Sequence, residues 1–165
     1  MSGMKGYFDR LMLVLATGFG TGLSPFASGT VGTLPALPFL WFVWPLLDWP
    51  QQLVVALALA AVAIPICSAA ERQFRTKDDG RIVADEFMTF PLCMIGLPGN
   101  SLLMLAIAFV TCRIFDILKP EPADRLQAVK GGTGIVLDDV VASLYSLVVN
   151  HVIYYFLVNS HWQVL

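Results

Sequence analysis

The stretch FMTFPLCMIGLPGNSLLMLAIAFVTC, residues 87–112, carries no charged side chain and decides how this chain can fold. As one straight helix it would be long enough to cross a bilayer, which would place the flanking acids Asp85 and Asp116 roughly 30 Å apart on opposite faces. The turn sequence Pro98-Gly99-Asn100 divides the stretch into halves that are too short to cross separately. We therefore expect residues 87–112 to fold back on themselves and to return both acids to the same end of the molecule.

Acids are scarce in this chain, and five of them lie in three short clusters beside uncharged stretches. The clusters are Asp85-Glu86, Asp116 and Asp138-Asp139, in a sequence of which only 13% is charged. Carboxylates in apolar surroundings are costly unless a cation or a basic group compensates them. A hard divalent cation prefers oxygen ligands. If the chain folds back as expected, the three clusters can meet and form a metal site.

Composition indicates a membrane protein built as one domain, residues 1–165. Hydrophobic residues make up 57% of the chain, and the mean hydropathy of +0.73 exceeds what soluble domains usually show. The net charge of −2 gives no electrostatic footprint for a nucleic-acid partner. The three cysteines lack a CxxC pattern and are expected to be buried, reduced thiols. A very apolar soluble domain with ordinary core helices is the alternative.

Hydrophobic segments free of glycine and with few prolines predict three long helices, at residues 53–70, 102–119 and 140–158. Pro65 is a possible kink in the first, Pro120 ends the second, and Asp138 or Asp139 is a candidate N-cap of the third. The sequence Asp48-Trp49-Pro50 offers a second chain reversal, between residues 34–47 and 53–70. Residues 17–35 and 129–134 are predicted to be glycine-rich loops.

The predicted fold class is therefore all-α: a compact multihelical array with apolar helical hairpins and one polar, carboxylate-rich end. Two hairpins, at residues 48–50 and 98–100, would bring the polar blocks 71–86 and 113–139 to that end.

Two of the three acidic clusters also have a purely structural interpretation, and the third faces a geometric constraint. Asp116 lies three residues from both Arg113 and Lys119, so the three side chains can form a salt-bridge ladder on a helix surface. Asp138 or Asp139 can simply cap a helix. Asp85 and Glu86 are neighbours and point about 100° apart on a helix, so both can face one point only if the backbone bends or one binds through water.

Two glycine-rich segments, residues 18–24 and 28–33, suggest an anion site. Small residues expose backbone N–H groups there, and the hydroxyl groups of Ser24, Thr30 and Thr33 add donors. The signal is weak because the segments contain neither a Walker lysine nor a complete dinucleotide fingerprint. A tight loop with helix caps is the alternative interpretation.

Four motifs in order resemble the phosphatidylglycerophosphatase A family and together cover nearly the whole chain. They are GTGLSP and GTVGTLP at residues 20–25 and 29–35, IVADEF at 82–87, RIFDILKP at 113–120, and GGTGIVLDDV at 131–140. The departures are small: Ser28 stands where the family often has proline, and Thr89 where glycine is common. Neither departure removes a carboxylate.

The resemblance implies a magnesium-dependent lipid phosphomonoesterase of a bacterial inner membrane. Its substrate would be phosphatidylglycerol phosphate, and its products phosphatidylglycerol and phosphate, as a step in phospholipid synthesis. The phospholipid and the membrane are the partners expected from it. A phosphatase for another lipid phosphomonoester, and a non-enzymatic divalent-cation-binding membrane protein or carrier, are the two alternatives.

The expected roles of the residues follow from this chemistry. The five carboxylates and Lys119 would be the catalytic residues. The carboxylates would hold one or two Mg²⁺ ions, directly or through water. Basic side chains and hydroxyl groups would bind phosphate and stabilise developing charge. The metal ligands are Asp85, Glu86, Asp116, Asp138 and Asp139; the phosphate-binding residues are Ser24, Thr30, Thr33, Arg113 and Lys130.

Basic residues near the apolar segments predict which side the polar end faces. Both polar blocks are rich in Lys and Arg, and such short loops stay on the cytoplasmic side of a bacterial inner membrane. We therefore expect single cysteines placed at positions 77 and 124, in a chain without native cysteines, to react from the same side of intact vesicles. Labelling of one position only from outside and of the other only from inside would contradict the fold-back topology.

Overall fold

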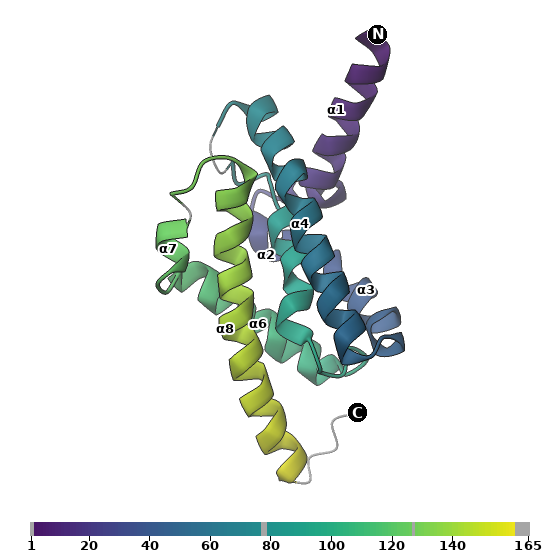
Figure 1. Cartoon of the computed structure of the whole chain (residues 1–165), viewed down its shortest axis with the longest axis vertical. Coiled ribbons are helices and arrows are strands. Elements are labelled where there is room, and N and C mark those ends of the chain that lie inside the picture. Colours follow the sequence, from purple (N-terminus) through teal and green to yellow (C-terminus); the bar gives the residue numbers. More distant parts are fainter. Residues whose placement is uncertain (1, 77–78, 127, 161–165) are drawn as a thin grey trace.

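The structure, a computed structural model, describes residues 2–76, 79–126 and 128–160, and all regular elements in these ranges are helical (Figure 1). The all-α prediction is therefore confirmed. Position 77 of the labelling prediction and the side chain of Gln127 lie outside the described residues. The elements are α1 (Ser2–Ala16), η1 (Gly18–Leu23), α2 (Ser28–Thr33), α3 (Ala36–Phe42), η2 (Trp44–Leu46), α4 (Trp49–Phe74), α5 (Ala84–Thr89), η3 (Phe90–Met94), α6 (Leu102–Leu118), α7 (Ala123–Leu126) and α8 (Gly132–Asn159).

The long helices α4 and α6 start and stop where local chemistry allows. At the start of α4, the Asp48 side chain accepts from the Gln51 N–H, and the Gln51 side chain accepts from the Asp48 N–H, which is a capping box. At the start of α6, the Ser101 side chain caps Met104 N–H. The helix ends at Lys119, which adopts a left-handed conformation directly before a proline. A new helix therefore starts at each of the two predicted chain reversals.

Helix α8 begins earlier than predicted, at Gly132, so the N-capping interpretation of Asp138 and Asp139 is wrong. Both acids lie in the second turn and are buried. The early start depends on a close approach of α8 to α4. The N–H of Gly132 donates to the Ser68 hydroxyl group at 2.9 Å, and a Cβ on Gly132 would collide with the Ile64 carbonyl oxygen.

The prediction that residues 17–35 form a loop is also wrong, because this segment contains η1 and α2. Its glycines allow the short helices to pack tightly. A Cβ on Gly22 would strike the Arg81 carbonyl group, and one on Gly32 would strike Val83. The N–H of Val83 in turn donates to the Ala16 carbonyl oxygen at 2.8 Å. The segment thus folds against residues 81–83, directly before α5.

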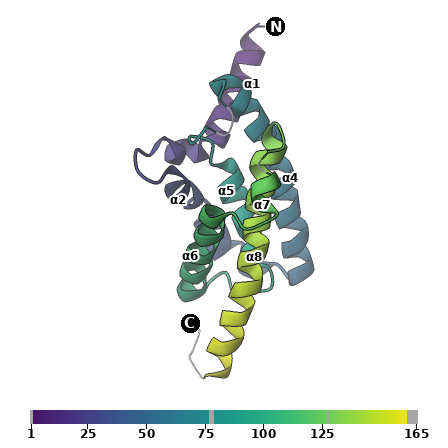
Figure 2. The same ribbon diagram turned by 90° about the vertical axis from the view of Figure 1, so that its left-hand side faces the viewer.

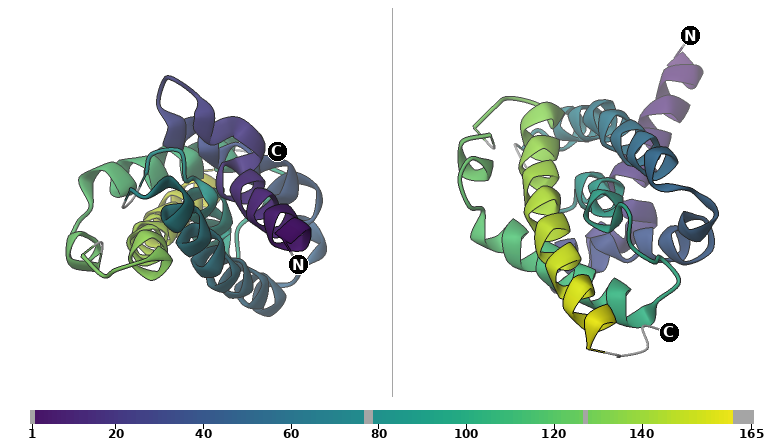
Figure 3. Two further views of the ribbon diagram at one scale, coloured as in Figure 1. Left: turned by 90° about the horizontal axis from the view of Figure 1, so that it is seen from above. Right: turned by 60° about the horizontal axis from the view of Figure 1, so that its bottom comes forward.

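The short elements α5 and η3 lie in the middle of the array, between α4, α6 and α8 (Figure 3). The backbone of residues 93–96 runs from the buried end of η3, at Cys93 and Met94, to exposed Gly96, and its buried polar groups would be costly to leave unpaired. Side chains from distant elements bind it. The carbonyl oxygens of Cys93, Met94 and Ile95 face Asn150, Trp44 and His151 at 3.0, 3.0 and 2.9 Å, and the N–H of Gly96 donates to Gln52 at 2.7 Å.

These contacts hold the fold-back that residues 87–112 require. In Figure 1 the C-terminal end of α4 and the start of α8 lie toward the top, while the starts of α4 and α6 lie toward the bottom. Figure 2 shows the same arrangement from the side of α7, with α8 in front of α4. The three cysteines are buried thiols that form no disulfide within the described residues, as predicted.

Within the described part of the chain, three stretches are long and apolar enough to cross a membrane by length and composition. They are Ser28–Leu46, which is divided among α2, α3 and η2, and the helices α4 and α8 of 26 and 28 residues. Their hydropathies of 1.2, 2.5 and 1.6, together with the exposure of many large apolar side chains, support the predicted association with a membrane.

Removing Asn150 should destabilise the fold by disconnecting η3 from α6 and α8. Its side chain donates to the Cys93 carbonyl oxygen at 3.0 Å and accepts from the Thr111 hydroxyl group at 2.7 Å, fully buried. Leaving such groups unsatisfied costs about 1–3 kcal/mol. We expect Asn150→Ala to lower the free energy of unfolding in detergent by that amount. Asn159→Ala, at the exposed end of the same helix, is the control, and equal stability of the two variants would contradict the assignment.

Candidate active site

All five acids predicted from the sequence line one polar pocket of about 220 Å³. The pocket is formed where the starts of α5 and α8 meet the C-terminal end of α6. Its lining residues are Ser28, Gly80, Ile82, Asp85, Glu86, Asp116, Lys119, Asp138 and Asp139. Residues that are more than 50 positions apart in the sequence thus meet at one place, as the fold-back argument required.

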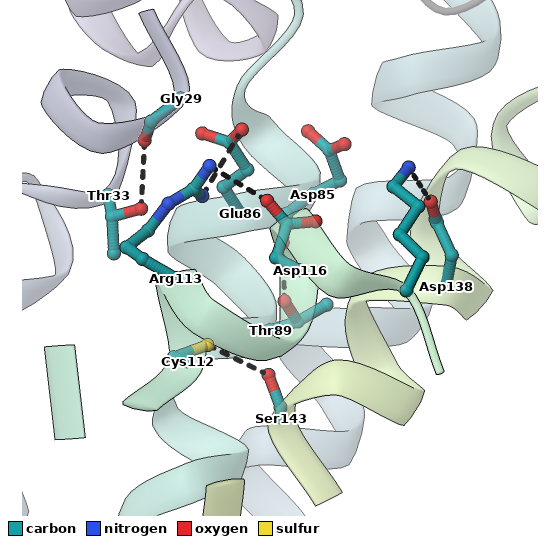
Figure 4. Close-up of polar contacts among 11 residues, drawn as sticks. Gly29, Thr33, Asp85, Glu86, Thr89, Cys112, Arg113, Asp116, Asp138 and Ser143 are labelled. Carbon is teal, nitrogen blue, oxygen red and sulfur yellow. Dashed lines mark hydrogen bonds and ion pairs between the residues drawn. The ribbon is translucent and has the colours of Figure 1, made fainter. Parts of the chain in front are cut away.

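Helix α5 places two neighbouring acids on the pocket despite the angle between them. Asp85 and Glu86 both lie in its first turn. Asp85 is buried and faces the middle of the site, whereas Glu86 turns toward α6 (Figure 4). The hydroxyl group of Thr89 donates to the Asp85 carbonyl oxygen at 2.7 Å and supports this turn. Each acid therefore serves a different part of the same pocket.

Arg113 joins two of the acidic clusters. Its guanidinium group lies 3.4 Å from Glu86 and 2.7 Å from Asp116, the latter one helical turn along α6 (Figure 4). All three side chains are at most about 15% exposed, so solvent screens these ion pairs weakly. The pairing fixes the position of α5 relative to α6.

Lys119 makes the second ion pair, across to α8. Its ammonium group lies 2.7 Å from Asp138. Burial alone would lower the pKa of Lys119, but the hydrogen bond and charge of Asp138, with the charges of Asp116 and Asp139, outweigh it and raise that pKa. Lys119 is therefore protonated at neutral pH. The predicted Arg113–Asp116–Lys119 ladder is only half formed, because the left-handed turn at Lys119 directs its side chain to α8.

The pocket carries more negative than positive charge. Five carboxylates face two cations, which leaves an excess of three negative charges if every group is ionised. Asp139 is buried, lies within electrostatic range of Asp85, Asp116 and Glu86, and its Oδ2 atom makes no hydrogen bond to the described residues. Clustered buried carboxylates of this kind repel one another unless a cation is added.

The chemistry of the pocket fits a hard divalent cation, although its carboxylates do not form a closed coordination shell. Among the described residues, no three His, Cys, Asp or Glu side chains are arranged as a ready metal site. Mg²⁺ does not need such a cage, since it usually keeps several waters and is bound through one or two carboxylates. The donor set is all oxygen, and Asp139 Oδ2 is available.

None of the five residues predicted to bind phosphate lines the pocket, although Arg113 pairs with two of the acids that do. Ser24 donates its hydroxyl group to the Phe26 carbonyl oxygen, Thr33 donates to that of Gly29, and Lys130 is exposed in the turn before α8. Thr30 is partly buried in α2 and is likewise absent from the lining. Their role in phosphate binding stays a prediction.

Sequence reasoning missed three residues that line the pocket: Ser28, Gly80 and Ile82. Ser28 belongs to the second glycine-rich segment but was not selected with Ser24, Thr30 and Thr33. Gly80 lies two residues before the IVADEF motif and Ile82 is its first residue, and only their proximity to the acids identifies them.

The chain matches proteins of one family along most of its length. The family model described as Phosphatidylglycerophosphatase A matches residues 14–154. Phosphatidylglycerophosphatase A of Escherichia coli (strain K12) is 37% identical over 153 residues, which cover 90% of this chain and 84% of the relative. The protein of the same name from Haemophilus influenzae is 32% identical, covering 87% and 89%.

A third relative carries a different name. It is the "Putative phosphatidylinositol-3-phosphatase" of Bacteroides thetaiotaomicron, 32% identical over 84% of this chain and 90% of its own length. No solved structure matches the chain.

The fold and the acidic pocket, taken with these matches, define the class of protein as a phosphatase. The chain belongs to the phosphatidylglycerophosphatase A family, as its four motifs predicted.

A substitution at Gly29 tests whether activity depends on the close packing of α2 against the Arg113–Glu86 ion pair. A Cβ on Gly29 would collide with Glu86 Oε1 and would lie 2.7 Å from Arg113 Nη2. We expect Gly29→Ala to displace both side chains and to lower phosphatase activity at least tenfold. Overpacking of this kind costs about 1–3 kcal/mol in stability. Gly6→Ala, where nothing lies within 4 Å, is the control, and full activity of Gly29→Ala would contradict the assignment.

Proposed function

We propose that this protein hydrolyses the phosphomonoester of phosphatidylglycerol phosphate in a Mg²⁺-dependent reaction. The observation that carries the proposal is the convergence of five carboxylates from α5, α6 and α8 on one pocket, with Lys119 in its lining and Arg113 paired to two of the acids. Membership of the phosphatidylglycerophosphatase A family supports the choice of substrate.

The five carboxylates Asp85, Glu86, Asp116, Asp138 and Asp139 would hold the metal, some of them through water. When bound, Mg²⁺ neutralises phosphate oxygens and favours in-line attack by water. Asp139 is the strongest candidate ligand, because its Oδ2 atom is buried and makes no hydrogen bond to the described residues.

The chain's own cations would bind the phosphoryl group. Protonated Lys119 and the guanidinium group of Arg113 lie on opposite sides of the carboxylates and can stabilise negative charge on the phosphate oxygens. One carboxylate of the pocket would accept the proton of the attacking water as the bond between phosphorus and the glycerol oxygen breaks, and a proton would pass to the departing glycerol oxygen to form its hydroxyl group. The products are phosphatidylglycerol and inorganic phosphate.

The proposal places the pocket at the cytoplasmic face of a bacterial inner membrane. The basic residues of the two polar blocks support this orientation through the positive-inside bias. The long helices α4 and α8 extend away from the pocket end, so the acyl chains of a substrate can stay in the bilayer while its headgroup reaches the acids.

Hydrolysis of another lipid phosphomonoester is the second candidate, and one finding favours it. A relative of similar identity is named a putative phosphatidylinositol-3-phosphatase, so a substrate with a different headgroup fits the same architecture. A carrier for divalent cations is less favoured, because transport requires acids near the middle of the membrane with access from both sides. The acids here gather in one pocket where α5 and α8 begin and α6 ends.

Phosphate release from phosphatidylglycerol phosphate in detergent micelles, with Mg²⁺ and with a chelator, tests the proposal. We expect release only with Mg²⁺, and slower release from phosphatidylinositol 3-phosphate. Preference for the inositol lipid would support the second candidate, and no release from either lipid would contradict both.

Asp85→Asn, Asp116→Asn and Asp138→Asn should each lower turnover at least a hundredfold without unfolding the protein. Each change removes a charge and keeps the side-chain volume, and the loss of like-charge repulsion offsets part of the lost ion pairing. The control is Asp124→Asn in the exposed helix α7, which should retain full activity. Normal turnover by a folded Asp116→Asn protein would remove that residue from the site.

A further inference from the structure

A second, entirely apolar groove of about 530 Å³ runs between α3 and the first half of α6. All ten residues that line it are hydrophobic, among them Leu34, Leu37, Trp41, Leu105, Ala106 and Val110. Its volume falls in the range of sites for small ligands, about 300–1,000 Å³. We propose that this groove binds an acyl chain of the lipid whose phosphate is hydrolysed in the acidic pocket; the inference rests on the proposed function.

The chemistry of the groove selects hydrocarbon. An extended peptide would find no hydrogen-bond partner among the apolar residues that line it, and burying its backbone there would be costly. A helix is too large: ten helical residues, about 10 Å wide and 15 Å long, fill roughly 1,200 Å³. A single narrow chain without polar atoms satisfies both limits.

The position of the groove connects it to the acids. Along α6, Val110 lines the groove and Arg113, three residues later, binds Glu86 and Asp116 of the acidic site, a rise of about 4.5 Å. The opposite wall makes the same connection, because Ser28 lines the pocket and Leu34 lines the groove. A lipid with its phosphate at the acids would therefore meet the groove directly.

The length of the groove suits the chain of a membrane lipid. The groove residues on α6 run from Leu102 to Val110, a rise of about 12 Å, and Arg113 lies about 4.5 Å beyond Val110 along the helix. Leu102, Phe42 and Val110 are 71%, 71% and 55% exposed, so the groove is open along its side rather than enclosed. A chain can enter laterally from the bilayer while the headgroup remains at the pocket.

Filling the groove separates chain binding from hydrolysis. Ala106 lines the groove and is exposed, so Ala106→Trp should block it without disturbing the core. Its control is Ala61→Trp, an exposed alanine on α4 that lines none of the described pockets. Each variant is assayed for phosphate release from long-chain phosphatidylglycerol phosphate in mixed micelles and from its deacylated, water-soluble headgroup.

We expect Ala106→Trp to raise KM for the long-chain lipid about tenfold and to leave kcat/KM for the deacylated substrate within twofold of wild type. Ala61→Trp should match wild type on both. Equal effects of Ala106→Trp on the two substrates, no effect on either, or the same effect from Ala61→Trp would overturn the groove while leaving the proposed hydrolysis intact. Failure of wild type to hydrolyse either substrate would overturn the proposed function and the groove with it.

Crosslinking gives a readout that does not depend on turnover. A phosphatidylglycerol phosphate with a diazirine at the middle of one acyl chain should label peptides of α3 and α6 after illumination. Ala106→Trp should lower that labelling and Ala61→Trp should not. Labelling spread evenly over α4 and α8 would overturn the proposal, because it would report ordinary bilayer contact.

Discussion

Repulsion among five clustered carboxylates is the constraint on which the rest of this structure depends. The acids line one small pocket at the end of an apolar body, where charge is costly to bury. Arg113 and Lys119 offset part of this cost, and each bridges two helices. The pairs therefore hold α5, α6 and α8 together while leaving an excess of negative charge. A protein selected only for stability has no reason to gather five acids at one point.

Bringing the acids together requires the chain to reverse inside its most apolar segment, and the reversal needs polar support. The backbone of residues 93–96 is held by side chains from three other elements: Asn150, Trp44, His151 and Gln52. Specific hydrogen bonds far from the pocket thus determine whether Asp85 and Asp116 share one end of the molecule. The part of the array around residues 93–96 thus positions the site without contributing to its chemistry.

The sequence predicted much of this arrangement, and its errors have physical causes. Long apolar segments predicted the all-α class. Charge patterning and the turn at residues 98–100 predicted the fold-back and the convergence of the acids, because uncompensated carboxylates in apolar surroundings are costly. The predicted start of α8 was wrong. Gly132 was interpreted as part of a loop, but because it has no Cβ it permits α8 to pack closely against Ser68. The glycines at 22, 29 and 32 were interpreted as an anion cradle, and their contacts with Arg81, Glu86 and Val83 depend on tertiary packing that no local pattern reveals.

The central claim is that the acidic pocket binds a hard divalent cation, and binding of Mn²⁺ as a paramagnetic substitute tests it most directly. Titration of the purified protein in detergent, followed by electron paramagnetic resonance, measures bound and free Mn²⁺ without any need for substrate. The account predicts saturable binding by wild type, competition by Mg²⁺, and affinity lowered at least tenfold in Asp139→Asn, with Asp124→Asn unchanged. Equal Mn²⁺ binding by wild type and Asp139→Asn, or no saturable binding at all, would contradict it.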